Sequence, residues 1–206
     1  MVTARAHLLR VDPVLAPVIR ATPLLRPLRR RGSLFAHLVR VILAQQISVA
    51  AANSITARVA AACAGRITPA TILALDHAGL RAAGCSGPKA RSILALATDE
   101  AAGRLRLRGI GRLGDEDAHA RLCAIRGIGP WTAEMVLLFR FGRPDVFSPG
   151  DIGLRRAVER LYELPRDLDE RAWRARAAAI SAVWRPHRST ACRYLWAWGD
   201  ADIVYE

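Results

Sequence analysis

Lysine is nearly absent from this chain. Lys89 is the only lysine among 31 basic residues, so a reaction that needs a lysine amine has a single candidate. Long apolar runs are also missing. Although 52% of the residues are apolar, no stretch of about 18 residues is free of charge, which argues against a membrane-spanning helix. Arg5 and Arg10 interrupt the N-terminal segment, so we expect no secretory signal and a cytoplasmic protein.

Cysteine is scarce and scattered. The four cysteines stand singly at 63, 85, 123 and 192, with no CxxC pair. This spacing cannot supply a clustered four-cysteine iron–sulfur site, and isolated cysteines behave as small buried apolar residues in a reducing compartment. We therefore expect neither a disulfide nor a structural metal cage.

Positive charge is what the chain has in excess. Its formal net charge is +13, which favours a polyanionic partner because a basic surface gains free energy when it displaces counterions from phosphates. An arginine-rich genome would produce the same balance without any ligand, and charge alone leaves both explanations open.

Apolar residues recur at helical spacing almost everywhere, and no sustained alternation predicts a sheet. The sequence therefore predicts an all-α protein. Helix starts are indicated at Ser33, at Thr68 before a proline, and at Asp167 with Glu170 three residues later. Segment 104–117 is rich in glycine and charge, and we interpret it as a long loop. The expected helices are 12–21, 33–45, 48–63, 69–76, 88–100, 116–125, 131–141, 151–163, 168–184 and 187–198.

A glycine-rich turn joins two of these helices within 118–141. Gly127 and Gly129 allow a tight turn and a close approach of an anion to the main chain. The amides of the turn and of Trp131 and Thr132 would then face that anion at a helix N-terminus. The turn predicts a phosphate-binding site, although an ordinary helix–turn–helix connection with a glycine cap would have the same spacing.

The segment LCAIRGIGPWTAEMVLLF (122–139) resembles the helix-hairpin-helix of the HhH-GPD superfamily of DNA glycosylases. The following DVFSPGDIGLRRAV (145–158) resembles the superfamily loop that ends in the catalytic aspartate. FAHLVRVILAQQISVAAANSITARV (35–59) and WRPHRSTACRYLWAW (184–198) are similar to the AlkA-type 3-methyladenine DNA glycosylase II branch. The resemblance covers roughly residues 12–200.

This resemblance implies a two-lobed fold without the extra N-terminal β-domain of longer relatives. One lobe is 33–143 and ends in the hairpin; the other joins 1–32 to 144–206. Asp151 matches the catalytic aspartate, whose carboxylate stabilises an oxocarbenium-like sugar and orients water. From local sequence alone Asp151 would be a plain N-cap. The neighbouring Asp145 follows a proline and is expected to be a solvated loop residue.

Trp131 stands where bifunctional relatives carry a nucleophilic lysine. A tryptophan cannot attack the sugar, and Lys89 begins a distant helix where an amine more plausibly meets phosphate, so the resemblance implies a monofunctional enzyme. Trp131 and Trp196 match the tryptophans that flank the flipped base, where electron-rich rings suit a cationic methylated base. Either could instead be a core residue. Met135 and Ile152 occupy pocket positions that are tyrosine in the family pattern.

The resemblance also assigns residues to DNA binding. Gln46 matches the residue that enters the duplex where the base leaves, although adjacent glutamines also cap helices. Arg155, after the catalytic position, is expected to touch phosphate. The main-chain carbonyls of Cys123, Ile125 and Ile128 match those that bind Na⁺ or K⁺, and no cofactor is required for the chemistry.

The sequence thus predicts a nucleoid-associated monomer that binds double-stranded DNA with a flipped base. It would excise 3-methyladenine and 7-methylguanine. Two alternatives stay open: a glycosylase for etheno or deaminated bases, and a non-catalytic DNA-binding module. A bifunctional lyase is a weaker alternative, given the single lysine.

Overall fold

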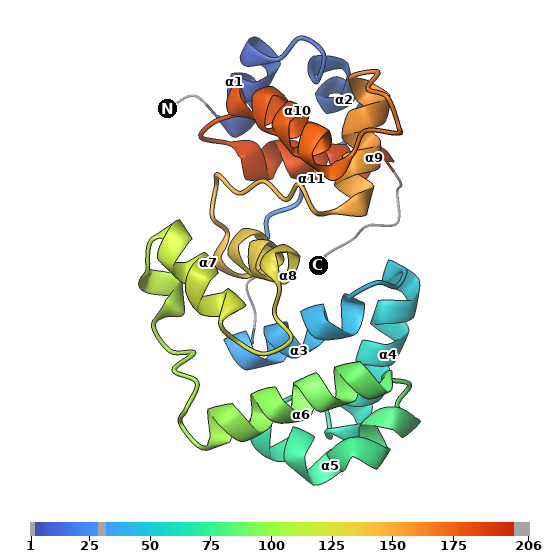
Figure 1. Ribbon diagram of the computed structural model, residues 1–206, viewed down its shortest axis with the longest axis vertical. Coiled ribbons are helices and arrows are strands. Elements are labelled where there is room, and N and C mark those ends of the chain that lie inside the picture. The colour runs from blue at the N-terminus through green and yellow to red at the C-terminus, as the bar shows by residue number, and fades with distance from the viewer. Residues whose placement is uncertain (1–2, 29–31, 200–206) are drawn as a thin grey trace. The chain divides into compact units, whose positions relative to one another are not determined.

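A computed structural model describes residues 3–28 and 32–199. Throughout these ranges the regular structure is helical and contains no strand, which confirms the all-α prediction (Figure 1). None of the described helices combines the length and the apolar character that crossing a bilayer would need.

The chain divides into two compact units. We call residues 30–141 the continuous unit, and residues 1–29 with 142–206 the split unit. The predicted bounds, 33–143 and 1–32 with 144–206, differ from these by three residues at one boundary and two at the other.

The continuous unit contains six α-helices and two short irregular helices among its described residues. Ser33, Ser48 and Ser86 each accept a hydrogen bond from the third amide that follows, which explains where three of the helices begin. In chain order the elements are α3 (Leu34–Ala44), α4 (Val49–Ala62), α5 (Pro69–Ala82), α6 (Gly87–Ala101), η1 (Ile110–Arg112), α7 (Asp115–Cys123), α8 (Pro130–Met135) and the π-helix η2 (Val136–Phe141).

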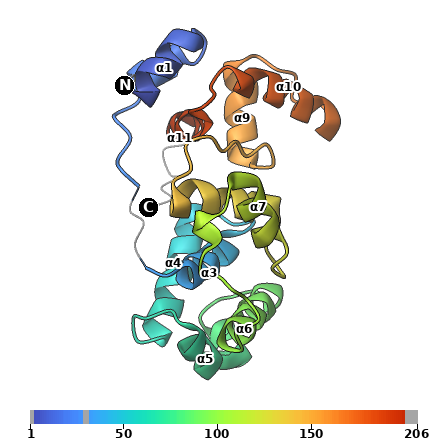
Figure 2. The same ribbon diagram turned by 90° about the vertical axis from the view of Figure 1, so that its left-hand side faces the viewer.

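The split unit brings the first and last helices of the chain together. Its first helices, drawn in blue, pack against the last one, drawn in red (Figures 1 and 2). Its helices are α1 (Ala4–Val11), α2 (Ala16–Ala21), α9 (Ile152–Leu161), α10 (Glu170–Ala182) and α11 (Arg188–Gly199).

Several predicted boundaries were wrong. Helix α1 was missed, and the helix predicted at 12–21 begins only at Ala16. The helix predicted to end at residue 76 continues to Ala82, after a kink at which Asp76 adopts a φ of 59°. Helix α10 is capped by Asp169 rather than Asp167. The long loop at 104–117 contains η1 and the start of α7, which has three acids in its first turn.

Asp12 is the polar centre of the split unit. Its Oδ1 accepts from the amides of Val14 (3.0 Å) and Leu15 (2.9 Å), and so starts the turn into α2. Its Oδ2 accepts from the hydroxyl of Tyr162 (2.5 Å) and from Nε1 of Trp184 (2.6 Å). One buried carboxylate thereby joins the N-terminal helices to the ends of α9 and α10.

His37 is half-buried on α3 of the continuous unit, and its Nε2 is inaccessible to solvent and has no hydrogen-bond partner among the described residues. Burial, with a smaller contribution from Arg140 and Arg40, lowers the pKa of His37 to about 4. An unfolded chain protonates this ring near pH 6.5.

Between pH 6.5 and 4 the unfolded state therefore binds more protons at His37 than the folded state does. We expect the stability of the continuous unit to fall as pH drops through this window, by about 3 kcal/mol at its lower end. Urea titrations at pH 7.5 and 4.5 measure the change, and His37→Gln should flatten it. An equally steep loss in the variant would show that His37 is not the cause.

Candidate active site

The hairpin between α7 and α8 is a tight turn closed by the amide of Ile128, which donates to the carbonyl of Ile125 (3.0 Å). Gly127 has a φ of +85°, and a Cβ there would lie 2.8 Å from Oγ of Ser92. The glycine is therefore required both by the backbone angle and by the close approach of α6. Gly129 is the N-cap of α8, and no side chain caps that helix.

Gln45, the C-cap residue of α3, forms hydrogen bonds with the hairpin. Its Nε2 donates to the carbonyl of Gly127 (3.1 Å) and to Oγ1 of Thr132 (3.0 Å). Thr132 is buried, so its hydroxyl braces the turn, while Gly127, Gly129 and Pro130 are exposed. The two exposed glycines leave main chain accessible at the turn, as a phosphate-binding turn requires.

Gly127→Ala should lower the free energy of unfolding of the continuous unit by about 1–3 kcal/mol, since the new Cβ meets both a left-handed backbone and Ser92. The matched control is Gly129→Ala, where φ is −91° and no atom lies within 4 Å of the added Cβ. Urea denaturation measures both variants. Equal midpoints for the two would contradict the assigned role of Gly127.

Asp151 caps α9 in the split unit. Its Oδ1 accepts from the amide of Leu154 (2.7 Å) and from Nε1 of Trp196 (2.9 Å). The aspartate side chain is buried, with 7% of the residue exposed. Two donors on one oxygen fix its rotamer, so the N-cap and the functional interpretation are compatible rather than alternatives.

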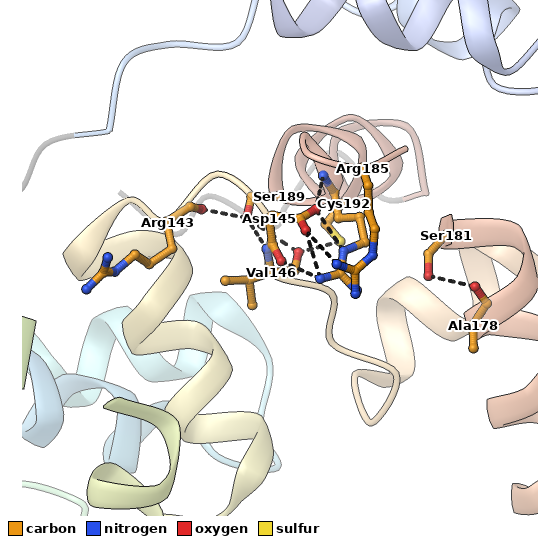
Figure 3. Close-up of polar contacts among 9 residues, drawn as sticks. Arg143, Asp145, Val146, Ala178, Ser181, Arg185, Ser189 and Cys192 are labelled. Atoms are coloured by element: carbon orange, nitrogen blue, oxygen red, sulfur yellow. Dashed lines mark hydrogen bonds and ion pairs between the residues drawn. The ribbon is translucent and has the colours of Figure 1, made fainter. Parts of the chain in front are cut away.

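The loop before Asp151 is held from two sides. Trp173 of α10, itself fully buried, donates from Nε1 to the carbonyl of Pro149 (2.8 Å). Ser189 of α11 accepts from the amide of Val146 (2.9 Å) and donates to the carbonyl of Arg143 (2.7 Å) (Figure 3).

Asp145 was expected to be a solvated loop residue, and this was wrong. Its Oδ1 accepts from Nε of Arg188 (2.8 Å) and its Oδ2 from the second guanidinium nitrogen (3.0 Å), a bidentate pair. Arg185 lies 3.4 Å from the same carboxylate (Figure 3). The pair ties the loop to α11, so residues separated by 43 positions hold the segment that ends in Asp151.

The predicted pocket residues lie in different surroundings. Trp196 is buried with its indole nitrogen on Asp151, whereas Ile152, the next residue on α9, is 67% exposed. Met135 is 1% exposed, and Trp131 is half-buried. Trp131 and Met135 belong to the continuous unit and Asp151 to the split unit, so their meeting at one flipped base stays a prediction.

Among the predicted DNA contacts, Arg155 forms hydrogen bonds inside the split unit. Its guanidinium donates to Glu159 (2.7 Å), to Glu170 (3.5 Å) and to the carbonyl of Leu168 (2.7 Å). It also lies over the ring of Trp173. All three nitrogens are thus engaged inside the split unit, which gives Arg155 a structural role that the sequence did not predict, and its contact with phosphate stays a prediction.

Lys89 and Gln46 are two further predicted DNA contacts, and the structure places them in different surroundings. The amine of Lys89 donates to the carbonyl of Leu43 (2.7 Å) at the end of α3, and burial lowers its pKa. The structure gives Lys89 a helix-capping contact that the sequence did not predict. Gln46 is exposed and has a φ of 58°, so it stands out from the turn after α3, and its entry into a duplex stays a prediction.

Sequence reasoning missed the residues that position the site. Gln45, Ser189 and Trp173 were not singled out as residues that position the site. A buried tryptophan on an otherwise charged helix, within RDLDERAWRARAAAI (166–180), was the one available signal for Trp173.

Known proteins support the predicted resemblance. The family model described as "HhH-GPD superfamily base excision DNA repair protein" matches residues 39–181. The chain is 34% identical over 177 residues to a putative DNA-3-methyladenine glycosylase of Bacillus subtilis, covering 82% of this chain and 60% of that protein. It is 31% identical to DNA-3-methyladenine glycosylase 2 of Escherichia coli, covering 77% of this chain and 55% of that protein. The chain therefore spans less than two thirds of both relatives.

A solved structure matches over nearly the whole chain. It is the 3-methyladenine DNA glycosylase of Schizosaccharomyces pombe in complex with abasic DNA, with a TM-score of 0.83, 30% identity, and coverage of 94% of this chain and 95% of that one. With the helical fold, the hairpin and the family match all in agreement, this chain belongs to the HhH-GPD superfamily of base excision DNA repair proteins.

Proposed function

We propose that this protein is a monofunctional DNA glycosylase that hydrolyses the N-glycosidic bond of alkylated purines, 3-methyladenine first and 7-methylguanine second. The observation that carries the proposal is the carboxylate of Asp151, held on one oxygen by Leu154 and Trp196. The names of the similar bacterial and yeast proteins support the substrate class.

The reaction suits a fixed carboxylate. An alkylated purine already carries positive charge, which weakens its bond to the sugar, and bond cleavage moves positive charge onto the sugar ring. A carboxylate held beside that ring stabilises the developing charge without reorganising, and it orients the water that completes hydrolysis. No cofactor takes part in these steps.

Duplex DNA is the proposed partner. The exposed main chain of the hairpin would bind a phosphate, and Gln46 would occupy the space left by the flipped base, with Trp131 and Trp196 beside that base. We propose that the protein acts as a monomer and is cytoplasmic and nucleoid-associated. Analytical ultracentrifugation and cell fractionation test these two points, and a dimer or a membrane-bound fraction would contradict them.

We propose that a monovalent cation binds at the hairpin. The proposed ligands are the carbonyls of Cys123, Ile125 and Ile128, the donor type that suits Na⁺ or K⁺. The Ile125 carbonyl accepts one hydrogen bond from Ile128, which leaves its second lone pair for an ion. An ion bound to these carbonyls would stiffen the turn. Thermal unfolding in K⁺ compared with tetramethylammonium at equal ionic strength tests the site, and identical curves would exclude it.

Base release measures the proposed activity directly. Wild-type protein incubated with methylated duplex DNA should free 3-methyladenine and 7-methylguanine, detected by chromatography, and leave abasic sites. Parallel duplexes carrying an ethenoadenine or a uracil test the alternative substrate class. If only those bases are released, the alkylpurine assignment is wrong, and if no base is released while duplex binding persists, the protein is a binding module.

Borohydride trapping separates hydrolysis from lyase chemistry. A monofunctional enzyme forms no Schiff base, so no covalent protein–DNA complex should accumulate on damaged DNA. A trapped complex would overturn the monofunctional assignment.

A further inference from the structure

A basic pocket lies between α9 and α11 of the split unit, two helices that pack side by side (Figures 1 and 2). Its volume is about 420 Å³, and its lining includes Arg156 and Arg160 of α9, Arg166 of the following loop, and Trp196. Gly199 lines it from α11. A Cβ at Gly199 would lie 3.3 Å from Cβ of Ala157, so the two helices approach closely there.

Three of the residues that line this pocket are arginines. Within residues 3–28 and 32–199 none of them forms an ion pair. The fourth charged lining residue, Glu159, is already bonded to Arg155 (2.7 Å). Among the described residues, the pocket therefore carries a positive charge that no ion pair offsets.

Helix α9 carries one pair of opposite charges and one pair of like charges. Arg155 and Glu159 are one helical turn apart and form an ion pair. Arg156 and Arg160, the next residues along the chain, are also one turn apart, but both are positively charged. Like charges at this spacing repel each other and destabilise a helix. An anion seated between them would remove the repulsion.

The arginines are also partly preorganised. The guanidinium of Arg160 lies over the ring of Trp198, 4.5 Å from its centroid, which holds the charged group at the pocket. A planar guanidinium presents parallel N–H groups that match the oxygens of a phosphate.

Trp196 links this pocket to Asp151. The indole lines the pocket while its Nε1 donates to the Asp151 carboxylate (2.9 Å). An anion in the pocket would lie one side chain away from that carboxylate, on the same helix pair that carries it.

From these observations we propose that the arginine pocket of Arg156, Arg160 and Arg166 binds a backbone phosphate of the DNA strand. The inference rests on the proposed function, because it assigns a second phosphate contact to the same substrate. It adds the exposed neighbour Arg156 to the contact predicted for Arg155, whose guanidinium already bonds within the split unit.

The salt dependence of duplex binding tests this site. Arg156→Ala and Arg166→Ala should each weaken binding to undamaged duplex about tenfold at low salt. Each should also reduce the slope of log K against log[salt] by about 1. Arg156→Lys should keep most of the slope while losing part of the affinity, because the charge remains and the bidentate geometry is lost. Arg176→Ala is the matched control, since it removes one exposed arginine from α10, outside the pocket.

The outcomes separate this proposal from the proposed function. A slope unchanged in Arg156→Ala and Arg166→Ala overturns the site even if wild-type protein releases bases. A reduced slope supports it even if no base is released, in which case only the enzymatic proposal fails. If inorganic phosphate or a nucleoside monophosphate binds through Arg156 while duplex affinity is unaffected, the pocket serves free phosphate and the assignment to the strand is wrong.

Discussion

Replacing Asp151 with asparagine should reduce base release from methylated DNA by about 10²- to 10⁴-fold. The substitution removes the negative charge that stabilises the oxocarbenium-like sugar but keeps the shape of the side chain. Asparagine can still accept from the amide of Leu154 and from Nε1 of Trp196, as Oδ1 of Asp151 does. The substitution should therefore lower the rate of base release without lowering the stability of the fold.

Chromatography of freed 3-methyladenine and 7-methylguanine measures the effect under single-turnover conditions, where product release does not limit the rate. Two controls show that the variant is intact. Its unfolding midpoint should match the wild type, because aspartate and asparagine are comparable N-caps, and its affinity for undamaged duplex should not decrease. Equal rates of release by both proteins would remove Asp151 from the mechanism.

The second large effect is expected on stability. Asp12→Ala should lower the free energy of unfolding of the split unit by about 3–5 kcal/mol. Four donors lose their acceptor at once: the amides of Val14 and Leu15, the hydroxyl of Tyr162 and the indole of Trp184. Burial, together with the bond to Asp12, raises the pKa of Tyr162, so this hydroxyl stays protonated and continues to need an acceptor.

Tryptophan fluorescence in urea is a suitable measurement. Four of the five tryptophans, at 173, 184, 196 and 198, lie in the split unit, so the signal reports mainly on that unit. Asp12→Asn is the graded control. Its amide retains one acceptor oxygen, and we expect an intermediate loss because the second oxygen, an acceptor, becomes a donor. A midpoint in Asp12→Ala equal to that of the wild type would show that the carboxylate does not join these helices.

Asp145 and Asp151 illustrate what local sequence can and cannot reveal. Both are acids in one loop, and Asp151 was identified because a recognisable hairpin lies upstream at the right distance. The partners of Asp145 are contributed by Arg185 and Arg188, some 40 residues later. No local pattern connects them, so the sequence predicted a solvated side chain where the fold forms a bidentate ion pair.

Arg155 and Arg156 show that local sequence cannot predict the surroundings even of two adjacent residues. Adjacent residues on a helix point in directions about 100° apart, so one can be internal while the other faces solvent. Both follow Asp151 closely, and the sequence offers no local signal that separates their roles. Only the positions of Glu159, Glu170 and Leu168 around one guanidinium distinguish them.

The sequence by itself determined the helical class, most helix starts, the glycine hairpin and the acid at the start of α9. These depend on short-range periodicity, capping and backbone freedom, or on a recognisable family pattern. Tertiary structure alone decided which polar groups are partners: Gln45 on the hairpin, Trp196 on Asp151, Arg188 on Asp145 and Trp184 on Asp12. These pairs are 43 to 172 residues apart, and they form because buried donors and acceptors must be satisfied by whatever the packing of distant helices brings within reach.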